Sequence, residues 1–220
     1  MNNAQAILFD LDGTLTDPGE GIINSIRYAL DVMGEMCPAP EVLASHIGPP
    51  LQLAFAAIFG PGKDDKVNTA VQLYRKRYSH DGWGMIENRL YSGIPECLKQ
   101  LQRAGKKLYV ATSKPTSITK QIISHFDLDP YFIVIYGSEL DGTRSDKGDL
   151  IAYLLKQENL RPDQAIMIGD RKHDIIGAAK NGVQGIGACW GYGAAEELIE
   201  AGAVALAQEP DGLPSLLLAQ

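Results

Sequence analysis

Two carboxylates, Asp10 and Asp12, follow the first apolar run of the chain, residues 6–9. In an extended strand, residues two positions apart point to the same side. Asp and Gly are also common turn residues, so the pair, with Gly13 behind it, could simply end a buried strand in a turn. The alternative is a functional site. Residues elsewhere in the sequence are needed to choose between the two interpretations.

Chemically active side chains also lie where other apolar runs end. They are Thr112, Ser113 and Lys114 at the end of one run, Lys147 at the start of the helical segment after another, and Asp170, with Asp174 shortly after it, at the end of a third. The carboxyl ends of parallel strands lie along one edge of a sheet, so these groups would converge there. Clustered carboxylates repel one another, and Mg²⁺ relieves this repulsion while keeping water and phosphate as further ligands. Lysine and hydroxyl groups beside the metal suit a phosphate, so the pattern predicts phosphoryl transfer with an Asp as nucleophile.

The elements that must position these groups are short apolar runs separated by helical segments. The runs are 6–10, 107–113, 131–138, 165–170 and 185–190, and the segments between them are 93–105, 115–126, 147–159 and 173–182. The runs are continuous rather than alternating, which favours a parallel sheet that is covered on both faces. Repetition of strand and helix predicts an α/β fold with a doubly wound parallel sheet.

Residues 17–89 contain no good candidate for a parallel strand. The segments 19–34, 51–59 and 66–78 have the apolar spacing of amphipathic helices. We therefore expect an α/β catalytic core of residues 1–16 and 90–220, with a small all-helical cap of residues 17–89 inserted after the first strand. An insert at that point would lie over the strand ends where such sheets bind ligands.

Composition excludes several classes of partner. The formal net charge is −7 and no long basic stretch opposes it, which argues against a nucleic acid polymer or an anionic membrane. The three cysteines are far apart in the sequence and odd in number, which is typical of free thiols in a reducing compartment. Neither a signal peptide nor an apolar run of membrane-spanning length is present. We therefore expect a cytoplasmic protein that acts on a small molecule, as a monomer or a homodimer.

Four segments together resemble the motifs of the haloacid dehalogenase (HAD) superfamily, in particular phosphatases of its phosphoglycolate phosphatase-like branch with a small helical cap. They are DLDGTLTD (10–17), VATSKP (110–115), Lys147 in RSDKGDL, and IGDRKHD (168–174). Each motif is modest alone, but all four occur in order at the ends of expected strands. The resemblance covers nearly the whole chain.

The resemblance implies roles for the acidic residues. Asp10 would attack phosphorus and become an aspartyl-phosphate, and Asp12 would protonate the leaving oxygen and then deprotonate the hydrolytic water. The Mg²⁺ ligands would be the Asp10 carboxylate, the Asp12 backbone carbonyl and Asp170, and Asp174 would act through water or support these ligands.

The resemblance also implies a set of groups that hold the phosphate. Thr112, Ser113 and Lys147 would contact the phosphoryl oxygens, and Lys147 would also neutralise Asp10. Gly13 would let the backbone turn tightly beneath the phosphate. In the cap, Gly48 and Pro49 of the loop HIGPPL (46–51), together with Arg27, are candidates for selecting the substrate.

Two departures from the family pattern concern the substrate. Gly148 follows Lys147 where phosphoglycolate phosphatases usually have proline, and Ser113 stands where asparagine is usual. The phrase LDGTRSDKGDLI is more similar to a subgroup that includes broad 5'-nucleotidases. The expected function is therefore Mg²⁺-dependent hydrolysis of small phosphate monoesters, of the 5'-nucleotidase or phosphoglycolate phosphatase type. A phosphomutase of the β-phosphoglucomutase type, a pyrophosphatase and, more weakly, a non-catalytic binding protein remain as alternatives.

A glycine-rich stretch, GIGACWGYG (185–193), superficially resembles a dinucleotide-binding fingerprint. Its glycines fall at 185, 187 and 191, so the third is one residue late. We interpret the stretch as a late strand and the turn that follows it.

Overall fold

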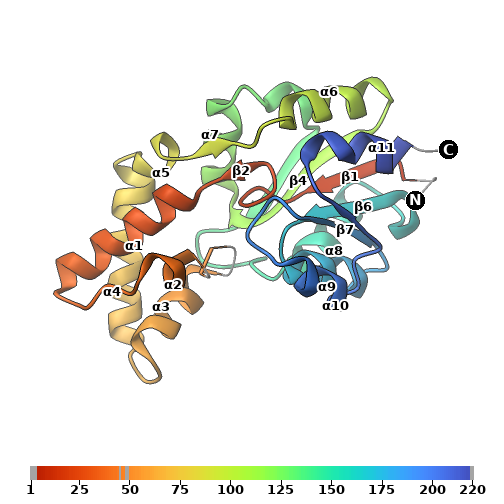
Figure 1. The fold of residues 1–220 in the computed structure, drawn as a ribbon. Helices are drawn as coiled ribbons and strands as arrows, with labels where there is room; N and C mark the ends of the chain where they lie inside the picture. Colours follow the sequence, from red (N-terminus) through yellow and green to blue (C-terminus); the bar gives the residue numbers. More distant parts are fainter. Residues whose placement is uncertain (1–3, 45, 48–49, 219–220) are drawn as a thin grey trace. The chain divides into compact units, whose positions relative to one another are not determined.

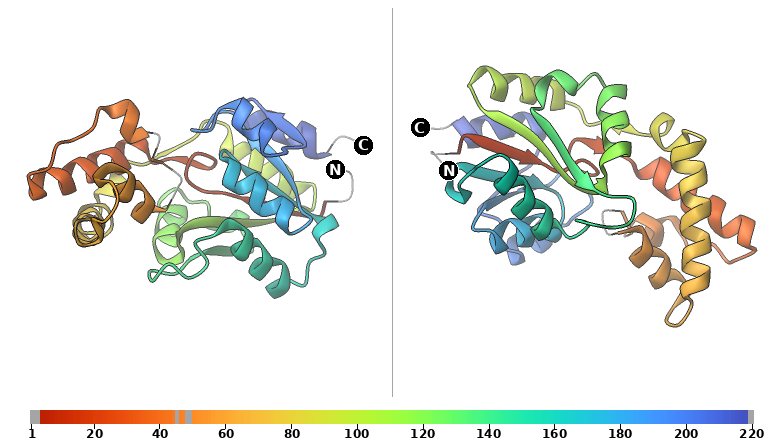
Figure 2. Two further views of the ribbon diagram at one scale, coloured as in Figure 1. Left: turned by 90° about the horizontal axis from the view of Figure 1, so that it is seen from below. Right: turned by 180° about the vertical axis from the view of Figure 1, so that it is seen from behind.

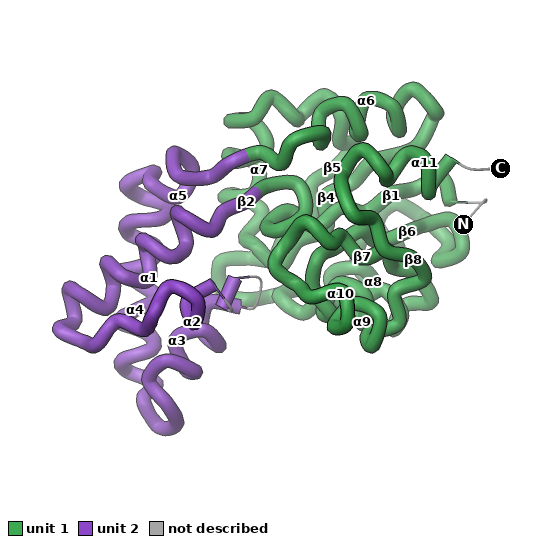
Figure 3. The backbone as a smooth tube through the Cα atoms, viewed as in Figure 1, with its two compact units in different colours: residues 1–16, 90–220 green, residues 17–89 purple. Residues whose placement is uncertain are grey.

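The structure is a computed structural model that describes residues 4–44, 46–47 and 50–218. The chain divides into two compact units (Figure 3): Met1–Thr16 with Leu90–Gln220, here the core unit, and Asp17–Arg89, here the helical unit. Two short strands, β2 (Thr16–Asp17) and β3 (Arg89–Leu90), pair where the chain passes between the units. Within the described residues, no helix has both the length and the apolar character needed to span a bilayer.

The core unit is built on a parallel sheet, as Figure 1 shows. Across the sheet the strands are β5 (Val134–Ser138), β4 (Lys107–Pro115), β1 (Ala6–Phe9), β6 (Ala165–Gly169), β7 (Gln184–Ala188) and β8 (Ala205–Ala207). All neighbouring pairs are parallel. The doubly wound α/β fold expected from the apolar runs is confirmed, while β8 is a short strand that the sequence pattern did not indicate.

Helices cover both faces of this sheet (Figure 2). They are α6 (Ile94–Arg103), α7 (Thr116–His125), α8 (Lys147–Gln157), α9 (Lys172–Lys180), α10 (Ala195–Glu200) and α11 (Leu213–Leu218), with 3₁₀ turns at Asp129–Tyr131, Pro162–Gln164 and Pro210–Gly212. Every residue of β1 is buried, and Ala6 and Leu8 pack in a cluster with residues of α8 and α9. Because side chains alternate along a strand, Ile7 and Phe9 fill the opposite face.

The helical unit consists of α1 (Gly19–Met33), α2 (Pro40–Ala44), α3 (Leu51–Phe59), α4 (Asp64–Arg75), a π-helical turn Lys76–His80 and α5 (Trp83–Ile86). Its small core includes Phe55, which meets Tyr74 edge to face. Arg77 and Glu87 form a two-fold hydrogen-bonded ion pair, at 2.7 and 2.8 Å, that stabilises the end of the unit. The helix expected over 66–78 begins two residues earlier and changes to the π turn after Arg75.

Candidate active site

The sequence-predicted acidic residues come together at the carboxyl edge of the core sheet. Asp10 directly follows β1, and its backbone N–H extends the strand ladder by donating to Ile168 O at 2.9 Å. Asp170 directly follows β6, the neighbour of β1. Asp174 lies in the first turn of α9. Parallel pairing of these strands is what places residues from distant parts of the sequence at one point.

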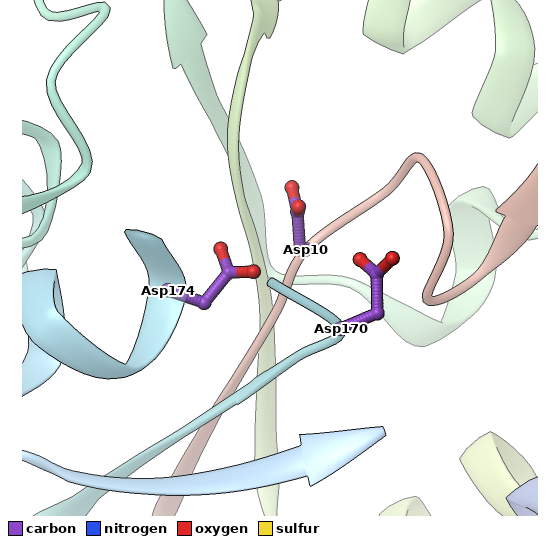
Figure 4. A group of neighbouring side chains, drawn as sticks. All are labelled: Asp10, Asp170 and Asp174. Atoms are coloured by element: carbon purple, nitrogen blue, oxygen red, sulfur yellow. The ribbon is translucent and has the colours of Figure 1, made fainter. Parts of the chain in front are cut away.

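Asp10, Asp170 and Asp174 form a buried acidic cluster (Figure 4). One carboxylate oxygen of each lies within 4.8 Å of the corresponding atoms of the other two. Asp170 and Asp174 are almost completely inaccessible, and Asp10 is 8% exposed. Such a group of buried carboxylates is unfavourable unless positive charge is nearby.

Lys147 supplies part of that charge. It begins α8, whose N-terminus is capped by the Asp146 side chain, which accepts from the N–H groups of Gly148 and Asp149. The Lys147 Nζ atom lies 2.9 Å from Asp10 Oδ1 and 2.7 Å from Asp174 Oδ1. It also donates to the Ala111 carbonyl at 2.9 Å. Lys147 therefore bridges two of the three carboxylates.

The pKa shifts in the cluster indicate that Lys147 alone does not balance its negative charge. Burial raises the pKa of Asp170 well above its ordinary value, and the charges of Asp174 and Asp10 raise it further. Burial also raises the pKa of Asp174, to about 6, although Lys147 opposes the shift. Burial works against the ammonium of Lys147, but the charges of Asp10 and Asp174 outweigh it and raise the Lys147 pKa. Asp170 and Asp174 therefore resist ionisation, whereas Lys147 stays charged.

Asp12 contacts a different cation, Lys114, whose Nζ lies 2.5 Å from Asp12 Oδ2. Both side chains are mostly buried. Burial raises the pKa of Asp12, while Lys114 opposes that shift. Lys114 was expected at this edge of the sheet with Thr112 and Ser113, but its pairing with Asp12 was not predicted.

The hydroxyl groups of β4 differ in what they do. Thr112 is buried, and its Oγ1 accepts a hydrogen bond from the Lys114 N–H at 3.2 Å. Ser113 Oγ donates to the Ser145 carbonyl at 2.9 Å. Ser113 thereby ties the end of β4 to the loop that leads into Lys147.

Gly13 is required by its surroundings. Its φ is +86°, a conformation that side-chain-bearing residues rarely adopt. A Cβ at this position would lie 2.2 Å from Asp170 Oδ2. The absence of a side chain at position 13 therefore lets the Asp170 carboxylate pack against the turn after Asp12.

The remaining candidates belong to the helical unit. Arg27 is half-buried on α1. Gly48 and Pro49 lie outside the described residues.

Comparison with known proteins identifies the family. The model of the haloacid dehalogenase-like hydrolases matches residues 7–188. The chain belongs to this family. A 5'-nucleotidase of Pseudomonas aeruginosa is 48% identical over 192 residues, covering 87% of this chain and 86% of that protein. The crystal structure of a predicted phosphatase from Clostridium acetobutylicum has a TM-score of 0.92 and 41% identity, with 99% of each chain covered.

A relative with another activity is also similar. Tyrosine-protein kinase PtkA of Mycobacterium tuberculosis is 40% identical over 192 residues, which is 87% of this chain but only 64% of that kinase. The HAD-family and phosphatase predictions made from the four motifs are confirmed: the chain is a HAD-family phosphatase, a hydrolase.

Proposed function

We propose that this phosphatase hydrolyses small phosphate monoesters through an aspartyl-phosphate on Asp10, with Mg²⁺ as cofactor and 5'-nucleotides as the preferred class of substrate. The observation that carries the mechanism is the buried cluster of Asp10, Asp170 and Asp174 bridged by Lys147. The 48% identity to a protein named 5'-nucleotidase supports the substrate class. The serine at position 113 and the glycine at 148 support it further.

The donor set fits a divalent cation. With all three acids ionised, three carboxylates and the Lys147 ammonium leave two negative charges in excess. Among the described residues, Asp10 Oδ1 and Asp174 Oδ1 are buried and have no hydrogen bond of good geometry, although Lys147 lies at ion-pair distance. Hard oxygen ligands of this kind suit Mg²⁺. The Asp10 carboxylate, the Asp12 carbonyl and Asp170 would hold it, and the ion would neutralise phosphoryl charge.

The chain's own residues would then perform two displacements. In the first, a carboxylate oxygen of Asp10 forms a bond to phosphorus as the ester P–O bond breaks, and Asp12 gives its proton to the leaving alkoxide. In the second, Asp12 takes a proton from water, which attacks phosphorus and releases phosphate from Asp10. Lys147 would lower the charge on the nucleophile and, with the Thr112 hydroxyl, hold the phosphoryl oxygens.

We propose separate roles for Ser113 and Arg27. Because the Ser113 hydroxyl donates to Ser145, we propose that its main effect on phosphate binding comes through the position of β4 and of the Lys147 loop. Arg27 remains our candidate for selecting substrates within the helical unit. We propose a small phosphorylated metabolite as the partner and the cytoplasm as the location. That the protein binds neither a nucleic acid polymer nor a membrane, and that it is a monomer or a homodimer, remain predictions from the sequence.

Phosphate release from a substrate panel tests the proposal. The panel contains several 5'-nucleotides, phosphoglycolate, sugar phosphates, pyrophosphate and an aryl phosphate, with Mg²⁺ and with chelator, and it is run beside Asp10→Asn. We expect release that requires Mg²⁺, is lost in the variant and is fastest with 5'-nucleotides. Isomerisation of a sugar phosphate without net phosphate release would instead identify a phosphomutase. Preference for pyrophosphate would identify a pyrophosphatase, and Mg²⁺-independent turnover would contradict the mechanism.

A further inference from the structure

The glycine-rich stretch after β7 takes part in the site in a way that the sequence did not indicate. Residues 189–193, here called the strap, begin at Cys189, whose N–H donates to the Ala207 carbonyl of β8 at 2.9 Å. From there the strap reaches the carboxyl edge of the sheet. There it contacts Asp170, the residue directly after β6, and the turn after β1.

Two hydrogen bonds fix the strap to the site. The backbone N–H of Tyr192 donates to Asp170 Oδ2 at 2.8 Å. The indole Nε1 of Trp190 donates to the carbonyl of Thr14 at 2.9 Å. Thr14 in turn contacts Asp170 Oδ1 through its hydroxyl, at a longer 3.4 Å. The strap therefore joins the turn after Asp12 to the carboxylate of Asp170.

The glycines of the strap permit backbone to pack directly on Asp170. A Cβ at position 191 would lie 2.3 Å from Asp170 Cβ and 2.3 Å from the Gly13 carbonyl oxygen. A Cβ at position 193 would lie 1.9 Å from the Asp170 carbonyl oxygen. All of these distances are far below van der Waals contact, so the close approach to Asp170 requires glycine at positions 191 and 193.

We propose that the 189–193 strap is a positioning element that holds the Asp170 carboxylate in one orientation and thereby sets the affinity of the core unit for a divalent cation. Trp190 locks the strap through its bond to Thr14, and Tyr192 orients Asp170 directly. This inference rests on the proposed function, because it takes Asp170 as a metal ligand. Hydrogen-bond partners of ligating carboxylates typically change metal affinity or activity about 10–100-fold when removed.

Direct binding of Mn²⁺ to the full chain, followed by the electron paramagnetic resonance of the free ion, tests the proposal without substrate. Trp190→Phe keeps an aromatic ring but removes the indole N–H. We expect its affinity for Mn²⁺ to fall about tenfold. The matched control is Trp83→Phe, the same substitution in the helical unit, which should bind Mn²⁺ as the wild type does. In turnover assays, saturating Mg²⁺ should restore the kcat of Trp190→Phe, because the variant weakens binding of the ion and leaves the reacting groups in place.

A second pair of variants isolates the bond to Asp170. Tyr192→Pro removes the backbone N–H, whereas Tyr192→Ala removes the side chain and keeps that donor. We expect the proline variant to bind Mn²⁺ about tenfold more weakly than the alanine variant. This pair decides the matter if circular dichroism shows that Trp190→Phe is unfolded.

The outcomes separate this inference from the function on which it rests. If the wild type binds Mn²⁺ and Asp170→Asn does not, while Trp190→Phe and Tyr192→Pro bind like the wild type, the strap has no positioning role and the metal site stands. If the wild type itself binds no Mn²⁺, or Asp170→Asn binds equally well, the metal assignment fails and the inference fails with it.

Discussion

Replacing Lys147 with methionine tests whether the acidic cluster is held together by one buried ammonium. Methionine has a similar length, but it removes the ion-pair partner of Asp10 and Asp174. The Lys147 side chain is 4% exposed, and that of Asp174 is 1% exposed. Removing one partner of a buried ion pair typically costs about 3–5 kcal/mol, because the other charge is left uncompensated. We expect a loss of this size near pH 7.5 in the metal-free protein.

The stability lost on replacing Lys147 should become smaller as the pH falls. The folded-state pKa of Asp174, raised by burial to about 6, lies above its unfolded value, so protonation of Asp174 stabilises the fold as the pH drops through 6. Through Asp174 alone, the wild type gains about 1 kcal/mol between pH 7.5 and pH 5. Without Lys147 the pKa of Asp174 would be higher still, so Asp174 stabilises the variant more over the same interval, by up to about 3 kcal/mol at about 1.4 kcal/mol per pH unit. The difference in the free energy of unfolding between the wild type and Lys147→Met therefore narrows by up to about 2 kcal/mol.

Urea denaturation at both pH values, in the presence of chelator, measures this difference. The matched control is Lys180→Met, because Lys180 is exposed and lies 3.9 Å from Asp146, an arrangement worth little. We expect the control to change the free energy of unfolding by less than about 1 kcal/mol at either pH. A Lys147→Met variant that is as stable as the wild type, or equally destabilised at both pH values, would refute the account of the cluster.

Three further predictions concern neighbouring groups. Gly13→Ala places a methyl group 2.2 Å from Asp170 Oδ2 in a backbone with φ +86°, so we expect lost turnover and a lower urea midpoint; a fully active variant would show that the turn can move. Thr112→Val should reduce kcat/KM more than Ser113→Ala, which should cost about 1 kcal/mol of stability through the lost bond to Ser145; the reverse order in kinetics would assign Ser113 to the phosphate. Mg²⁺ should raise the melting temperature more near pH 7.5 than near pH 5, because protons compete for Asp170, whose pKa burial and nearby carboxylates raise; calorimetry showing an equal shift at both pH values would contradict this.

Much of the site could be predicted because the chemistry is tied to strand ends. Continuous apolar runs indicate buried parallel strands, and a carboxylate or hydroxyl directly after such a run lies at the carboxyl edge of the sheet. Asp10 and Asp170 each come directly after such a strand. Lys147 lies at the same edge because it is the first residue of helix α8. These positions depend on local sequence and on strand order alone.

Other contacts could not be predicted because they depend on how separate loops approach one another. The ion pair of Lys114 with Asp12 and the bond of Ser113 to Ser145 have no spacing that indicates them. The strap was interpreted as a turn after a strand, since nothing in its sequence shows that Gly191 packs on Asp170. Short edge elements such as β8 carry too few residues to produce a clear periodic pattern.

Trapping the phosphoenzyme shows whether Asp10 is the nucleophile. The wild type is mixed with Mg²⁺ and its best substrate, quenched in acid and reduced with borohydride, which converts an aspartyl-phosphate to homoserine, and the peptide around residue 10 is then sequenced by mass spectrometry. We expect homoserine at position 10 in the presence of substrate and none in its absence. Active turnover without modification of Asp10, or modification at another carboxylate, would contradict it.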